Sequence, residues 1–167
     1  MHKELGLKEG ELRDSYKLAD IEKIVDRYLM PYWRAGTIYA FNGEIGAGKT
    51  TMLKVLLQRA GVEAEIISPT YAYYCEYLSS DDTPIYHFDL YRVDSIQTFC
   101  EIGFDFLIKD QKNVVVIEWP GVIDVVLREQ NFSDRVVWVN LGYALTGSNH
   151  RLFTVSSLAK KNESSLI

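Results

Sequence analysis

The sequence predicts an α/β fold in a single domain, and three observations support this prediction. A strand candidate at 37–42 leads into a glycine-rich loop at 43–48, and a helix candidate follows at 50–59. A short apolar run at 114–117 has the pattern of a strand buried on both faces, which is typical of parallel sheets. The chain has 167 residues, the length of one domain, and no linker, internal repeat or low-complexity tract divides it.

The N-terminal half alternates helix and strand candidates. Apolar residues recur at helical spacing over 17–30, which predicts an amphipathic helix. Residues 37–42 are β-branched and aromatic, as strands are, and residues 50–59 have the apolar face of a helix. An aromatic run at 71–77 and the segment 85–93 are further strand candidates, separated by a polar turn.

The C-terminal half continues in the same manner. The candidates, in chain order, are helices over 95–108 and 121–130 and strands over 114–117, 135–141 and 152–156. The last two strands are expected to form a hairpin. Residues 159–167 are predicted to be a disordered tail, so that the domain is expected to span residues 1–158.

Composition and charge exclude several classes of protein. The formal net charge of −5 argues against a protein that coats nucleic acid, because neutralising phosphates requires clustered lysine and arginine. No apolar stretch approaches the ~18–20 residues of a membrane helix. The first thirty residues are charged and lack an apolar signal core, so we expect a cytoplasmic protein. Cys75 and Cys100 lack metal-ligand spacing and are expected to be reduced thiols.

The glycine-rich loop carries the clearest chemistry. Gly43-Glu44-Ile45-Gly46-Ala47-Gly48-Lys49-Thr50 matches the pattern G-x-x-x-x-G-K-[ST] in full. Such glycines let the backbone wrap tightly and point its N–H groups inward, where they and the helix N-terminus stabilise phosphate charge. Lys49 can reach the β- and γ-phosphates, and the Thr50 hydroxyl can coordinate Mg²⁺. The segment therefore predicts binding of a nucleoside triphosphate with Mg²⁺.

Polar residues beyond the loop are candidates for the rest of the site. Glu118 directly follows the apolar run at 114–117, where a phosphate-binding loop requires an acid for the metal. Asp89 is either a solvent-exposed acid or a site residue that polarises water. His87, by itself, is interpreted as a hydrogen-bonded structural residue. Thr70 belongs either to an ordinary Ser-Pro turn or to a switch that senses the γ-phosphate and metal.

Four segments follow one another along the chain: Gly43-Glu44-Ile45-Gly46-Ala47-Gly48-Lys49-Thr50-Thr51, Ser68-Pro69-Thr70-Tyr71 with Glu76-Tyr77, His87-Phe88-Asp89-Leu90-Tyr91-Arg92, and Ile117-Glu118-Trp119-Pro120. Taken together and in this order, they resemble segments of the TsaE/YjeE family of bacterial ATPases in tRNA threonylcarbamoyladenosine biosynthesis. The resemblance covers roughly residues 15–156. The loop is common to many families, whereas the last two segments in this order are highly specific.

The resemblance implies a P-loop NTPase fold of three layers, with a mainly parallel central sheet and antiparallel edge strands. It implies that Thr50 and Glu118 are the Mg²⁺ ligands and that Lys49, Thr70 and Asp89 serve catalysis, Thr70 as a switch-like residue and Asp89 in hydrolysis. The residues expected to bind the nucleotide are Glu44, Ile45, Gly46, Ala47, Gly48, Lys49, Thr50, Thr51, Trp119 and Arg151, with base contacts around residues 18–21 and 150–151.

The resemblance also implies protein partners. ATP hydrolysis by this chain would reset an assembly of TsaB- and TsaD-like proteins between turnovers, and tRNA would be reached indirectly through those partners. The chain departs from the family's pattern at Phe104-Asp105-Phe106-Leu107, outside the nucleotide site.

Two other functions would also use a phosphate-binding loop. A small-molecule P-loop kinase usually requires an arginine-rich lid, whereas the arginines of this chain are scattered. A GTP switch would carry an Asn-Lys-x-Asp segment for reading the base, and the chain has none. The kinase remains the alternative to the ATPase.

Overall fold

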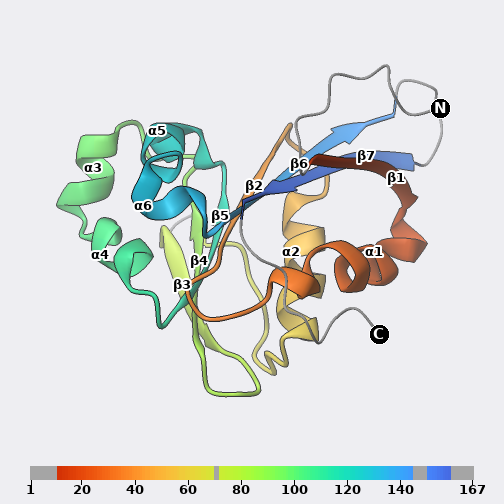
Figure 1. Cartoon of the computed structure of the whole chain (residues 1–167), viewed down its shortest axis with the longest axis horizontal. Coiled ribbons are helices and arrows are strands. Elements are labelled where there is room, and N and C mark those ends of the chain that lie inside the picture. The colour runs from red at the N-terminus through yellow and green to blue at the C-terminus, as the bar shows by residue number, and fades with distance from the viewer. Residues whose placement is uncertain (1–10, 70–71, 145–149, 159–167) are drawn as a thin grey trace.

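The computed structural model describes residues 11–69, 72–144 and 150–158. The described residues form a seven-stranded sheet with the strand order β1-β7-β6-β2-β5-β4-β3 (Figure 1). The strands are β1 Glu11–Lys17, β2 Ile38–Gly43, β3 Tyr74–Leu78, β4 Pro84–Asp89, β5 Val114–Glu118, β6 Val136–Tyr143 and β7 His150–Ser157.

Strand direction changes from the centre of the sheet to its edges. The central strands β6, β2, β5 and β4 pair in parallel. The pairs β1–β7, β6–β7 and β3–β4 are antiparallel. The predicted α/β class is confirmed, and the antiparallel pairs lie at the edges, as the resemblance implied.

Helices cover both faces of the sheet, which gives three layers (Figure 1). On one face lie α1 Ile21–Tyr28 and α2 Lys49–Arg59. The other face is covered by α3 Ile96–Glu101, α4 Phe104–Lys109, α5 Asp124–Leu127 and α6 Gln130–Ser133. Successive residues of β2 point to opposite faces, so Phe41 packs with Leu56 in one apolar core, whereas Ala40 belongs with Phe99 to the other.

The N-terminal prediction is wrong in two respects. Residues 11–17, to which no element was assigned, form the edge strand β1. The helix predicted over 17–30 is shorter, because α1 is flanked by the 3₁₀ turns η1 Leu18–Asp20 and η2 Met30–Tyr32. Pro31 lies within η2, where it has no N–H to continue an α-helix.

Three further boundaries differ from the prediction. The strand predicted over 85–93 ends at Asp89, because its carboxylate accepts the backbone N–H of Tyr91 and turns the chain. The helix predicted over 95–108 is divided at Gly103, which has a φ of +86°. The segment 121–130 forms the 3₁₀ turn η3 Pro120–Ile123 and then α5 and the start of α6, in place of one helix.

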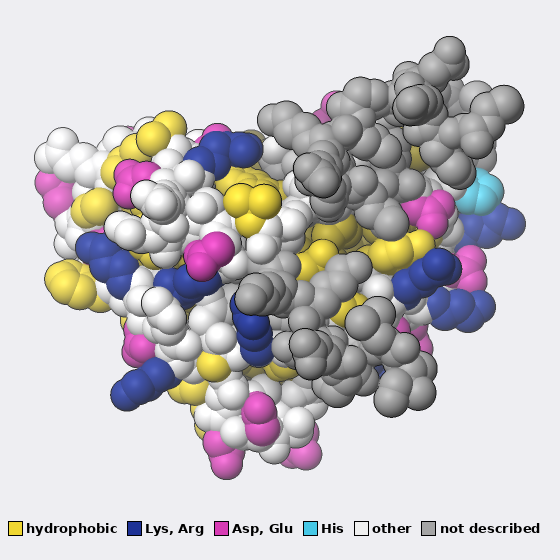
Figure 2. All heavy atoms as spheres, viewed as in Figure 1, with side chains coloured by type: hydrophobic (Ala, Val, Ile, Leu, Met, Phe, Trp, Pro, Cys, Tyr) yellow, Lys and Arg dark blue, Asp and Glu magenta, His cyan; other side chains and the backbone are white. Residues whose placement is uncertain are grey.

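The remaining described elements lie within about three residues of their predicted bounds, and β6 and β7 form the expected antiparallel pair. The predicted tail at 159–167 lies outside the described residues. Within the described part of the chain, no helix has the length and apolar character needed to cross a membrane. On the face shown in Figure 2, the lysine and arginine side chains lie interspersed with aspartate and glutamate.

Candidate nucleotide site

The candidate site lies where three parallel strands end beside the glycine-rich loop. In the sheet, Glu118 at the end of β5 is in register with Phe41 of β2 on one side and with Asp89 of β4 on the other. The chain leaves β2 through the loop and enters α2 at Lys49. Ligands of open α/β sheets bind at the carboxyl ends of the strands, so the topology places this loop and both acids at the expected edge.

The loop requires glycine at two of its positions. Gly43 has a φ of +141°, and a Cβ there would overlap the carbonyl oxygen of Leu141 on the neighbouring strand β6. Gly48 has a φ of +100° and immediately precedes the first turn of α2. A side chain at either position would strain this backbone conformation, so the glycines allow the loop to close against the helix N-terminus.

Lys49 is held inside the loop. Its Nζ donates hydrogen bonds to the carbonyl oxygens of Gly43 at 2.8 Å and Glu44 at 3.0 Å, and it lies 3.6 Å from the centroid of the Trp119 ring. Burial lowers the pKa of the Lys49 ammonium, while the charges of Glu118 and Asp89 oppose this shift. A phosphate entering the loop would therefore meet a cation that is already positioned and partly desolvated.

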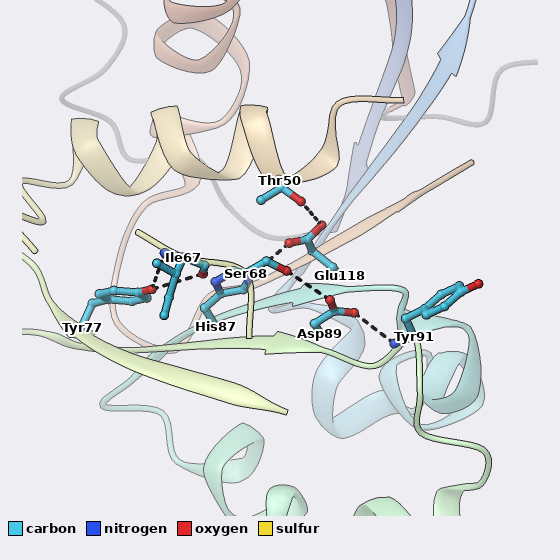
Figure 3. Close-up of polar contacts among 8 residues, drawn as sticks. All are labelled: Thr50, Ile67, Ser68, Tyr77, His87, Asp89, Tyr91 and Glu118. Carbon is cyan, nitrogen blue, oxygen red and sulfur yellow. Dashed lines mark hydrogen bonds and ion pairs between the residues drawn. The ribbon is translucent and has the colours of Figure 1, made fainter. Parts of the chain in front are cut away.

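Glu118 connects the loop helix to the centre of the sheet. Its Oε2 accepts a hydrogen bond from the Thr50 hydroxyl at 2.7 Å, and its Oε1 lies 3.1 Å from Nε2 of His87 (Figure 3). Glu118 is 3% exposed and His87 is fully buried. The sequence predicted Thr50 and Glu118 in one site and His87 as a structural residue, so the contact between His87 and Glu118 was not predicted.

Asp89 is fixed by hydrogen bonds on both carboxylate oxygens. Oδ1 accepts the backbone N–H of Tyr91 at 3.1 Å, and Oδ2 accepts the Ser68 hydroxyl at 3.3 Å (Figure 3). The residue is 7% exposed, which excludes the interpretation of Asp89 as an acid on a solvent-exposed face. Ser68 belongs to the Ser-Pro-Thr segment, so this segment reaches the site, although Thr70 itself lies outside the described residues.

A pocket of about 400 Å³ opens over these groups. Its lining residues are Ile45, Gly46, Gly48, Lys49, Thr50, Thr51, Asp89, Tyr91, Glu118 and Trp119. All of them except Tyr91 were predicted site residues. Tyr91, which is 55% exposed, packs against Trp119 with ring centroids 5.1 Å apart. Its place beside Trp119 depends on the turn after Asp89, which the predicted longer strand did not contain.

Three predicted nucleotide contacts lie beside this pocket and do not line it. Glu44 contributes its carbonyl oxygen to Lys49, and the side chain of Ala47 is buried beneath the loop. Arg151 lies on β7 with its guanidinium 4.8 Å from the ring centroid of Tyr143. The Tyr143 hydroxyl in turn donates to the carbonyl oxygen of Ile45 at 2.9 Å, so Arg151 reaches the loop through one intervening side chain.

A larger cavity, of about 860 Å³, lies around the β3–β4 turn. Its lining includes Glu63, Glu76 and Asp82, and the lining residues described there include neither lysine nor arginine. Such a surface would repel a triphosphate. The smaller pocket at the loop is therefore the candidate nucleotide site.

The oxygen atoms at this pocket fit a magnesium ion. The Thr50 hydroxyl and the Glu118 carboxylate are hard donors that lie together at the start of α2. Mg²⁺ prefers oxygen ligands and keeps several waters, so it is usually held by one or two protein groups and by substrate phosphates. The described residues hold no cluster of three or more His, Cys, Asp or Glu side chains that would form a metal cage.

The family model and the curated relatives that match this chain carry the same description. Residues 14–142 match the model of the family described as threonylcarbamoyl adenosine biosynthesis protein TsaE. The tRNA threonylcarbamoyladenosine biosynthesis protein TsaE of Rickettsia felis is 31% identical over 157 residues, which cover 93% of this chain and 82% of the relative. The TsaE protein of Rickettsia conorii is 35% identical over 133 residues, covering 78% and 70%.

A solved structure has a similar fold. The crystal structure of Bacillus subtilis YdiB superimposes with a TM-score of 0.65 at 22% sequence identity, and the match covers 89% of this chain and 86% of that chain. At this level of identity the comparison supports the fold alone. It agrees with the mixed α/β architecture of the described residues.

Proposed function

The chain belongs to the TsaE family of tRNA threonylcarbamoyladenosine biosynthesis proteins, and on this premise we propose that it is a P-loop ATPase. It would bind ATP with Mg²⁺ in the pocket at the glycine-rich loop and hydrolyse it slowly when alone. The observation that carries the proposal is the 2.7 Å hydrogen bond between Thr50 and Glu118, because it joins the loop helix to the acid of β5 beside a phosphate-binding backbone.

Each side chain has a role in the proposed reaction. Lys49 would exchange its bonds to the loop carbonyl oxygens for the β- and γ-phosphate oxygens. Thr50 and Glu118 would hold Mg²⁺, which supplies charge stabilisation at the phosphates. Asp89 would accept a hydrogen bond from the attacking water through its carboxylate, whose orientation Ser68 and the turn after β4 fix. Thr70 would sense the γ-phosphate.

ATP hydrolysis would serve a protein assembly. TsaB- and TsaD-like proteins would be the direct partners, tRNA would be contacted through them, and exchange of ADP for ATP would begin the next cycle. The protein would act in the cytoplasm, where these partners would meet tRNA. Pull-down of TsaB- and TsaD-like proteins with ATP or ADP present tests it, and binding to neither partner in either state would contradict it.

The kinase alternative is less well supported. The residues that line the described pocket include one lysine and no arginine, whereas kinases usually close an arginine-rich lid over the transferred phosphate. This lining favours water as the acceptor of the phosphoryl group.

A pair of substitutions tests the nucleotide site. Lys49→Ala removes a charge-assisted contact worth about 1.5–3 kcal/mol, so ATP affinity should fall about 10- to 100-fold with or without Mg²⁺. Glu118→Ala should leave affinity in EDTA nearly unchanged and abolish the gain that Mg²⁺ confers. Isothermal titration with ATP, in Mg²⁺ and in EDTA, measures both effects.

Two substitutions outside the pocket serve as controls for this titration. Lys54→Ala changes an exposed lysine of the same helix, and Glu63→Ala changes an acid of the other cavity. Both variants should titrate like the parent protein. Equal losses in Lys49→Ala and Glu118→Ala under both conditions would refute the division of roles between the two residues.

A further inference from the structure

His87 is a buried polar residue that contacts Glu118 and has no role in the proposed reaction. It lies on β4 between Ile85 and Asp89 on the face that α2 covers, and its side chain is fully buried. Its Nε2 lies 3.1 Å from Oε1 of Glu118. Its Nδ1 has no hydrogen-bond partner among the described residues.

The burial of His87 is unfavourable for stability taken alone. An imidazole moved from water into an apolar core loses its solvation, and the remaining contact with Glu118 compensates for one nitrogen only. On the neighbouring strand β5 the position in register is Val116, and Ile85 of β4 lies two residues earlier on the same face. A residue that served packing alone would be apolar here, as these two neighbours are.

The contact with His87 helps to fix the orientation of the Glu118 carboxylate. His87 is in register with Val116 of β5, so Glu118 lies two residues further along on the same face of the sheet. The carboxylate is thereby held at both oxygen atoms, by the imidazole at Oε1 and by the Thr50 hydroxyl at Oε2. With a proton on Nε2, the ring is the donor to Oε1, and the bare Nδ1 is left in the core.

We propose that His87 is a positioning residue of the metal site, which orients the Glu118 carboxylate so that Oε2 faces Thr50 and the ion. The inference rests on the proposed function, because it assigns a purpose to an arrangement around the proposed Mg²⁺ ligands. Hydrogen-bonded outer groups of this kind typically change metal affinity 10- to 100-fold when removed. His87 should therefore determine metal affinity and leave metal-free nucleotide affinity unchanged.

Three substitutions test this role. Gln at position 87 places an amide N–H near the position of Nε2, whereas Asn places its amide near Nδ1 and away from Glu118. His87→Leu removes the donor and retains an apolar side chain. We expect His87→Gln to keep the metal affinity within about threefold of the parent, and His87→Asn and His87→Leu to lose about 10- to 100-fold.

The measurements separate metal binding from folding and from catalysis. Free Mn²⁺ is titrated against each protein–ATP complex by electron paramagnetic resonance, and ATP affinity in EDTA is measured by isothermal titration. ATP affinity in EDTA should stay within about twofold of the parent for every variant that folds. If His87→Leu fails to fold, the comparison of the two amide variants still decides the question.

Several outcomes would overturn the inference. Unchanged Mn²⁺ affinity in His87→Asn or His87→Leu would show that Glu118 needs no orientation by this ring. Equal losses of ATP affinity in EDTA and in Mn²⁺ would assign His87 a merely structural role. Glu118→Ala distinguishes these failures from failure of the proposed function. If Glu118→Ala kept full Mn²⁺ affinity, Glu118 would not be a metal ligand and the proposed metal site would itself be refuted.

Discussion

Trp119 adopts a backbone conformation that residues other than glycine rarely adopt. Its φ is +59°, and its N–H donates to the carbonyl oxygen of Phe41 at 3.2 Å. The conformation places the indole ring beneath Lys49 and beside Tyr91. Such backbone strain is concentrated at functional sites, and here it directs an aromatic face toward the cation that would bind phosphate.

The residues around the pocket predict slow hydrolysis by the isolated chain. Among the described lining residues, Asp89 and Glu118 are the acids, and Glu118 is committed to Thr50 and His87. An arginine that could stabilise the transferred phosphoryl group is missing from this lining. We expect steady-state ATP turnover well below kinase rates, measured by phosphate release. Turnover on the order of 1–100 per second without partners would contradict this expectation.

Tyr39 predicts how stability depends on pH. The ring is fully buried, its hydroxyl donates to the carbonyl oxygen of Leu29 at 3.0 Å, and burial raises its pKa well above 10.0. Since the unfolded chain ionises near pH 10, the stability that this raised pKa reflects is present below pH 10 and is lost as pH rises above it. Tyr39→Phe should therefore unfold about 1–2 kcal/mol more easily at pH 7, with a smaller difference at pH 11.

Urea unfolding of the parent and Tyr39→Phe at both pH values measures this effect. Other buried tyrosines with raised pKa values, such as Tyr16 and Tyr77, remain in both proteins and cancel in the comparison. Tyr91→Phe, at a largely exposed ring, should change stability by less than about 0.5 kcal/mol at pH 7. A difference between parent and Tyr39→Phe that grows with pH would show the opposite linkage.

Single residues were predictable where a motif fixes both identity and spacing. Lys49, Thr50 and Glu118 were found because a glycine loop and an acid after a buried strand are both visible in the sequence. The contact of His87 with Glu118 was not predictable, because it depends on the register of β4 against β5 and joins residues 31 positions apart. The sequence around a single histidine does not indicate which atom its ring contacts in the core.

At the scale of elements, the main failure has a physical reason. Strand β1 pairs along its length with β7 and lies at the edge of the sheet. Its Asp14, Ser15 and Lys17 are exposed, whereas Tyr16 is buried. Main-chain hydrogen bonds hold such a strand, so it lacks the regular apolar alternation by which strands are recognised. The turn after Asp89 did have a signal, since an aspartate that accepts the N–H two residues later is a known turn former.

Substitution of Gly43, at the junction of β2 and the loop, should destabilise the fold. Gly43→Ala would force its Cβ into the carbonyl oxygen of Leu141 and would strain a φ of +141°. Strain and overpacking of this kind together should lower the free energy of unfolding by about 2–4 kcal/mol. Urea unfolding at neutral pH measures the loss.

Gly142 on β6 is the matched control for this change. A Cβ there meets nothing within 4 Å, and its φ is not positive. Gly142→Ala should stay within about 0.5 kcal/mol of the parent. Comparable losses in the two variants would mean that the close approach of β2 and β6 does not limit stability.

At the scale of the whole molecule, ligand binding should stabilise the fold by mass action. ATP with Mg²⁺ at 100 times its Kd should add about 2.7 kcal/mol, which raises Tm by roughly 5–10 °C for a chain of this size. Thermal unfolding with and without ATP measures the rise, and Lys49→Ala, whose affinity should be about 10- to 100-fold lower, should lose roughly half of it or more. A full rise in Lys49→Ala would place the bound nucleotide elsewhere.

The α/β architecture was predictable as a whole because its centre is regular. Buried parallel strands give continuous apolar runs, such as 114–117, and the glycine loop fixes the order of strand and helix. The layer that contains α3 to α6 was less predictable, since its helices are short and are interrupted at Gly103 and around Glu129. Short helices depend on packing against the sheet more than on local preference.

The pairing of β4 with β5 has a consequence for how a preparation of this protein should behave. His87, Asp89 and Glu118 reach one face together because the two strands meet in a single register. A slip of one residue in β4 would turn both of its polar side chains into the opposite core. Chains misfolded in this way should bind no nucleotide at the site. A partly misfolded preparation should therefore show fewer binding sites per chain, and the sites that remain should have the affinity of the correctly folded protein.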